Sequence, residues 1–128
     1  MSVTYKVIQR GEPGIVGGGT MKYYASANSN RAVDIEELTK TIEKISTVSG
    51  ADILAVLYSL VDVAVDKLAN GNIVRLGNLG SLRITLKSSG YANADNVNAS
   101  AIKGNRVVFT PGKKLKEMQK VLTYHKES

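Results

Sequence analysis

The feature that most constrains the fold is a helical segment, residues 50–69, that is apolar around most of its circumference. Ser49 suits the N-cap position, and Asp52 follows three residues later, where an acidic side chain favours a helix start. The apolar positions recur at helical spacing: Ile53, Leu54, Val56, Leu57, Leu60, Val61, Ala64, Val65 and Leu68. Because this face is too broad for one neighbouring helix, it must pack against something larger than a hairpin partner.

A second helix precedes this one. Asp34 suits its N-cap, Glu37 stands at the capping-box position, and apolar residues at helical spacing carry the helix to about Ser46. Asn70 and Gly71, which tolerate positive φ, close the longer helix. Residues 34–70 therefore predict a helical hairpin.

After Gly71 the apolar period changes from 3.6 to 2, which predicts strands broken by glycine turns at 77–80. Residues 88–101 are small and polar, as in a loop or flexible arm, and residues 106–109 form a further strand. Pro111 and Gly112 then begin a basic helix. We expect an α+β fold: a helical hairpin, a three-stranded antiparallel sheet with an arm, and a C-terminal helix.

Residues 1–32 differ from the rest. Two strand-like segments, 3–8 and 21–26, flank a glycine-rich stretch, 11–20, which predicts a β-hairpin with a mobile loop. A phosphate-binding loop is disfavoured, because Thr20 is followed by Met21 and the Gly-Lys-Ser/Thr sequence is missing. We expect an N-terminal extension at 1–32 and the main domain at 33–128.

Composition excludes several classes of protein. Without Cys there are no disulfides or thiolate metal sites, and the single His125 has no evident partner for a triad or a metal site. The first residues contain no apolar run long enough for a signal peptide, and the longest apolar stretch, 53–65, contains Asp62 and is too short to span a bilayer. We expect a cytoplasmic protein that is not an enzyme and has no cofactor, no small-molecule substrate and no membrane partner.

Charge is unevenly distributed along the chain. Residues 34–69 have a net charge of −4, whereas residues 70–120 have a net charge of +7. A basic block beside an acidic one favours a polyanion as partner, although basic patches also serve membranes and acidic proteins, and solvated side chains are the alternative.

The motifs of residues 33–122 together resemble the bacterial HU/IHF histone-like DNA-binding proteins. From Ser49 to Leu82 the chain follows their pattern without a gap, through Gly71, Val74-x-Leu76 and Leu79-Gly80-Ser81-Leu82. The run Phe109-x-Pro111-Gly112-x-x-Leu115-Lys116 then resembles the start of their last helix. The resemblance implies an HU/IHF-like fold as an intertwined homodimer, in the nucleoid. The expected interface comprises Leu57, Leu60, Val61 and Phe109.

The chain departs from the family where DNA would be contacted. Asn78 replaces a glycine of the turn, and Thr110 replaces a basic residue. The family's arms are basic and end in a proline that wedges between base pairs, whereas residues 88–102 contain no Pro, Lys or Arg. Weaker bending of DNA is therefore expected.

Phosphate contacts need only reach and positive charge. The candidate DNA-binding residues are Arg75, Arg83, Lys87, Lys103, Arg106, Lys113, Lys114 and Lys116. Unpaired N–H groups at the start of the last helix would add a phosphate site. Base stacking by tyrosines is less favoured than their packing in the hairpin.

The sequence therefore predicts sequence-independent binding of double-stranded DNA by a histone-like, nucleoid-associated architectural protein. The alternative is a protein-interaction or assembly module on the same fold, with little DNA binding.

Overall fold

The computed structural model describes residues 2–29 and 31–127. The chain forms two compact units, one made of residues up to 34 together with those from 118 onward, the other of residues 35–117. Each unit contains a three-stranded sheet. We call these the terminal sheet, with strand order β2-β1-β6, and the central sheet, with strand order β3-β4-β5.

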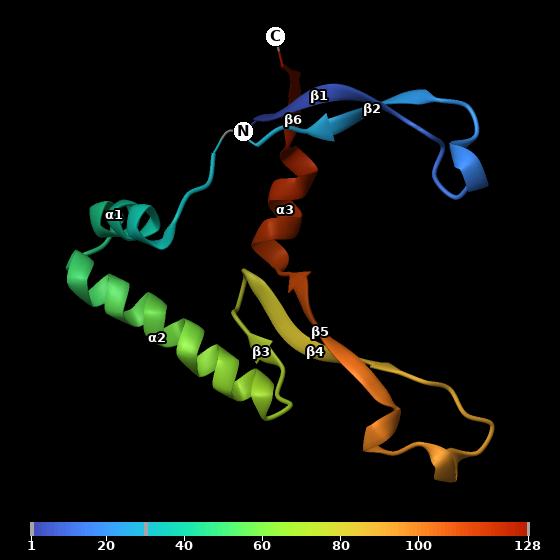
Figure 1. Ribbon diagram of the computed structural model, residues 1–128. Coiled ribbons are helices and arrows are strands. Elements are labelled where there is room, and N and C mark those ends of the chain that lie inside the picture. The colour runs from blue at the N-terminus through green and yellow to red at the C-terminus, as the bar shows by residue number, and fades with distance from the viewer. Residues whose placement is uncertain (1, 30, 128) are drawn as a thin grey trace. The chain divides into compact units, whose positions relative to one another are not determined.

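The helical hairpin of the second unit consists of α1 (Ile35–Ile45) and α2 (Gly50–Ala69) (Figure 1). The predicted cap is confirmed, since the Ser49 side chain accepts a hydrogen bond of 3.3 Å from the Asp52 N–H. The Glu43 carboxylate accepts from the Gly50 N–H, and the Tyr58 hydroxyl donates to Glu36 at 3.0 Å. These bonds fix the turn and the side-by-side packing of the two helices.

The central sheet is antiparallel, as predicted, and consists of β3 (Val74–Arg75), β4 (Gly80–Ser88) and β5 (Ile102–Pro111). β5 begins four residues earlier than the expected strand at 106–109. At Gly80, φ is +148°, and a Cβ would stand 2.4 Å from the Thr110 carbonyl oxygen and 2.7 Å from the Phe109 ring. The close approach of β4 to β5 therefore requires glycine at this position.

The connection between β4 and β5 is an irregular segment with some local structure, within the expected loop or arm. It contains two short 3-10 helices, η2 (Ala94–Asn96) and η3 (Ala99–Ala101), and the Asn98 side chain accepts a hydrogen bond from the Ser100 N–H at 3.0 Å. Ala101 is buried. These local contacts give short turns of helix to a segment whose composition is typical of a loop.

The terminal sheet confirms the predicted N-terminal hairpin, formed by β1 (Ser2–Arg10) and β2 (Lys22–Ala27), with a short helix η1 (Val16–Gly18) between them. Its third strand, β6 (Thr123–Lys126), follows α3 (Lys113–Val121) and pairs with β1 in parallel. The sequence pattern does not predict β6. A strand of four residues with no neighbouring partner in sequence leaves little periodic signal.

Few side chains are buried in this single chain. Among the described residues only Ile53, Ala101, Thr39 and Gly80 are buried, while Val56, Leu60 and Val63 of α2 are 44–65% exposed. The broad apolar face predicted for α2 is thus only partly covered by α1, β3 and β4.

Candidate nucleic-acid interface

The pleat of the central sheet sorts the candidate cations onto one face. Successive side chains of a strand point to opposite faces, and directly paired residues share a face. The register pairs Arg75 with Ser81 and Ser81 with Thr110, Arg83 with Val108, Thr85 with Arg106, and Lys87 with Gly104. One face therefore presents four exposed cations, which we call the cationic row: Arg75, Arg83, Lys87 and Arg106.

The opposite face of the same sheet is apolar. Leu82 pairs with Phe109 and Ile84 with Val107, and Leu86 continues the alternation. Leu86, Val107 and Phe109 are 61%, 57% and 44% exposed. The central sheet is therefore amphipathic, with charge on one side and an uncovered apolar surface on the other.

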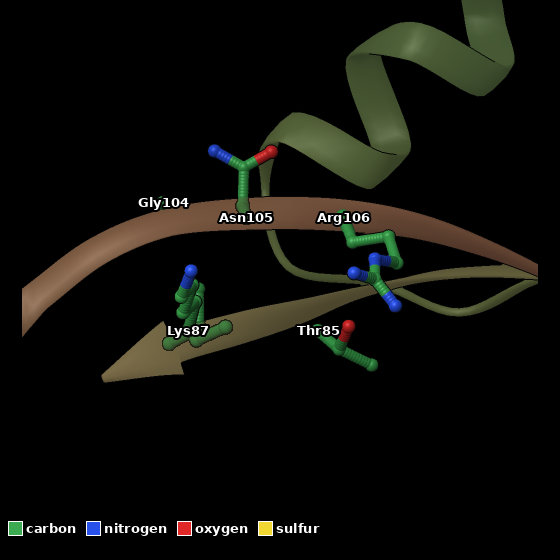
Figure 2. A pocket seen from close by; sticks show the side chains of 6 residues that line it. Thr85, Lys87, Gly104, Asn105 and Arg106 are labelled. Atoms are coloured by element: carbon green, nitrogen blue, oxygen red, sulfur yellow. The ribbon is translucent and has the colours of Figure 1, made fainter. Parts of the chain in front are cut away.

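Two of the row's cations border a hollow near the far end of β4 and β5. Thr85, Lys87 and Arg106 line it together with Leu86, Gly104 and Asn105, and its volume is about 400 Å³. Figure 2 shows the Arg106 side chain extending from β5 toward β4, whereas the Asn105 side chain extends the other way. No acidic residue lines the hollow, so its charge is wholly positive.

A second hollow, of about 290 Å³, lies at the other end of the sheet. Arg75 and Ser81 line it together with Thr110 and the residues that lead into α3. Here the Gly112 N–H donates to the Leu79 carbonyl at 2.9 Å, and the Lys114 N–H donates to the Asn78 carbonyl at 3.2 Å. The expectation that the donors at the start of α3 are unpaired is wrong for these two groups, because the turn before β4 already uses them.

The remaining candidate cations lie outside the cationic row. Lys113, Lys114 and Lys116 are exposed on the first turns of α3, where Lys113 and Lys116 share a helix face. Lys103 falls at the register shift between the Lys87–Gly104 and Ser88–Ile102 pairs. A bulge breaks the alternation, so Lys103 does not continue the row.

The connection between β4 and β5 offers no positive charge to this face. Its bulky side chains are Tyr91, 49% exposed, and Val97, 52% exposed. Tyr91 is aromatic and Val97 is apolar, and the segment that carries them contains no Lys or Arg.

The expected interface residues differ in exposure. Leu57 is half-buried and lines an apolar hollow with Ile42, Val48 and Ile53 of its own chain. Leu60, Val61 and Phe109 are 44%, 49% and 44% exposed. A separate apolar hollow of about 400 Å³ is lined by Ala55, Val56, Ser59, Leu60 and Val63.

Residues 2–29 and 31–127 contain neither a cluster of metal-ligating side chains nor a membrane-spanning helix. No three His, Asp or Glu side chains there come together as a metal ion would require. Nor does any helix of that part of the chain have the length and apolar character to cross a membrane.

A helical hairpin, followed by a three-stranded antiparallel sheet and a helix, is the arrangement expected of an HU-like domain. The model of the HU-HIG family, described as an HU domain fused to wHTH, Ig, or Glycine-rich motif, matches residues 1–126. The chain belongs to this family.

A solved structure is similar over nearly the whole chain. It is the 2.25 Å crystal structure of a "Putative bacterial DNA binding protein" from Bacteroides vulgatus ATCC 8482, with a TM-score of 0.68 and 16% identity. The match covers 98% of this chain and 48% of the other, so this chain spans about half the length of that protein. At this identity the likeness concerns the fold. No curated protein matches the chain.

Proposed function

We propose that this protein binds double-stranded DNA independently of sequence, as a homodimer with an architectural role. The observation that carries the proposal is the cationic row, four exposed Lys and Arg side chains on one face of the central sheet. Membership of the HU-HIG family supports DNA as the polyanion.

The chemistry of the row fits phosphate better than bases. Arg and Lys donors that neutralise phosphates release condensed counterions, and this drives binding without reading the sequence. Three of the four cations are arginines, whose guanidinium groups can hold phosphate oxygens with two parallel hydrogen bonds. The Lys113, Lys114 and Lys116 side chains of α3 would add further contacts.

A homodimer is supported by the apolar surfaces of the second unit. Val56, Leu60 and Val63 on α2 and Leu86, Val107 and Phe109 on the central sheet remain exposed in one chain. Exposed patches of this extent mark interaction surfaces. A second copy would cover them without any other partner.

The second candidate function is a protein-interaction or assembly module. It is favoured by the β4–β5 connection, which lacks Lys, Arg and Pro and so lacks both the charge and the rigid wedge of a DNA-bending arm. Salt-dependent DNA binding separates the two, because only the first requires it.

The test replaces Arg75, Arg83 and Arg106 together by Gln and measures affinity for a 40-bp duplex at 50 and 200 mM salt by fluorescence anisotropy. Each lost phosphate contact reduces the slope of log affinity against log salt by about 0.9, so we expect a reduction of about 2.7 for each copy on the duplex. Replacing Lys40 and Lys44 of α1 by Gln is the matched control and should leave the slope unchanged. An unchanged slope in the triple variant would show that another surface binds DNA.

A further inference from the structure

The terminal sheet repeats the charge sorting of the central sheet. In the register of β1 with β2, Lys6 pairs with Ser26, Ile8 with Tyr24, and Arg10 with Lys22. In the register of β1 with β6, Thr4 pairs with His125. Every cation of β1 and β2 therefore lies on one face of the terminal sheet, together with hydroxyl and imidazole groups.

The other face of the terminal sheet is apolar. Val3, Tyr5, Ala25, Ala27 and Tyr124 line a hollow of about 270 Å³ on that side. Lys126 pairs with Tyr5 and so is the one cation that β6 contributes to this apolar face.

Local contacts orient the cations of the polar face. The Arg10 guanidinium lies over the Tyr24 ring, 4.7 Å from its centre, and Lys22 forms an ion pair with Glu12. Stacking on Tyr24 restrains the Arg10 side chain while leaving its N–H edges available to an acceptor. Lys6 and Arg10 are both exposed.

We propose that the polar face of the terminal sheet, through Lys6 and Arg10, is a second contact surface for the phosphate backbone of duplex DNA. This inference rests on the proposed DNA binding of the central sheet. The chemistry is the same on both sheets: exposed cations share one face of the strands with hydroxyl groups that can donate to phosphate oxygens. The N-terminal hairpin thereby adds phosphate contacts without adding sequence readout.

The experiment compares the Lys6→Gln/Arg10→Gln variant with wild type on a 40-bp duplex at 50 and 200 mM salt. The slope of log affinity against log salt should fall by about 1.8 for each bound copy. Over this fourfold range of salt, wild type should therefore lose about twelvefold more affinity than the variant for each copy in the complex, or about 150-fold for a dimer. Lys126→Gln, on the apolar face of the same sheet, is the matched control and should keep the wild-type slope. Circular dichroism confirms that each variant is folded.

The outcomes separate the two proposals. An unchanged slope in the Lys6/Arg10 variant, or an equal fall in the Lys126 variant, overturns the second contact surface while DNA binding by the central sheet stands. If wild type itself shows no salt-dependent binding, the proposed function fails and this inference fails with it.

Discussion

Both sheets are amphipathic, but their strands come from different parts of the chain. Each has three strands and one face that gathers most of its cations, whereas the other face is mainly apolar and, in the terminal sheet, also carries Lys126. The central sheet is antiparallel and takes all its strands from residues 74–111. The terminal sheet joins a hairpin at the N-terminus to β6, which pairs in parallel from the other end of the chain. An amphipathic sheet can therefore be assembled from strands that are close in sequence or from strands that are far apart. All three strands of the central sheet were expected from the sequence pattern, whereas β6 of the terminal sheet was not.

The two units also differ in where they expose apolar side chains. The unit with the central sheet includes α2, whose exposed residues Val56, Leu60 and Val63 form one apolar surface. Among the described residues of the terminal unit, the most exposed apolar side chain is Val16. It lies on a glycine-rich loop whose ends are joined by a 2.7 Å hydrogen bond from the Glu12 N–H to the Gly18 carbonyl. Exposure on a helix face that could dimerise has a different meaning from exposure at a loop tip.

The largest expected effect follows from this contrast. Leu60→Asp should abolish the dimer and unfold the protein, because a carboxylate buried in an apolar interface costs roughly 3–5 kcal/mol. Val16→Asp makes the same chemical change at the loop tip and should leave the thermal midpoint unchanged. Analytical ultracentrifugation and thermal melts measure both. A Leu60→Asp protein that remains a folded dimer would contradict the assignment of this face.

A smaller loss of stability is expected at Gly80, the first residue of β4, where β4 approaches β5 closely. Gly80→Ala should destabilise the central sheet by about 2–3 kcal/mol, since the new Cβ meets the Thr110 carbonyl and the Phe109 ring and φ is positive. Gly90→Ala is the control, because a Cβ there has no neighbour within 4 Å. Chemical denaturation compares the two variants, and equal stabilities would show that the sheet relaxes around residue 80.

The smallest effect concerns the tip of the β4–β5 hairpin. Replacing residues 89–101 by an Asn-Gly turn should reduce affinity for DNA by less than about threefold, because the segment carries no cation. Energy transfer between dyes at the ends of a 35-bp duplex should show little bending with or without the segment. Strong end-to-end shortening that disappears in the variant would identify the segment as a wedge.

Much of the second unit could be predicted from the sequence. The Ser49 cap, the α1–α2 hairpin and the antiparallel central sheet follow from patterns within a few residues of one another. The four cations of the cationic row are all among the candidate residues from the sequence. That Lys103 does not share their face depends on a register shift after Lys87. A bulge depends on how two strands pair, so the sequence of one strand alone does not predict it.

The terminal sheet was only half predictable. Alternation identifies β1 and β2, and the even spacing of Lys6, Ile8 and Arg10 already places two cations on one face. The partner strand β6 comes from more than a hundred residues away, and its four residues carry no turn or hairpin signal that points to β1. Such long-range parallel pairing is decided by tertiary structure.

DNA binding through the cationic row is tested most directly by titrating the protein with duplex DNA while the arginine side-chain Nε–Hε signals are followed by NMR. The chain has five arginines, at positions 10, 31, 75, 83 and 106, so each signal can be assigned by substitution. Binding through the cationic row predicts that the signals of Arg75, Arg83 and Arg106 shift together as DNA is added and return as salt is raised. Unchanged signals from these three at saturating DNA would contradict the account.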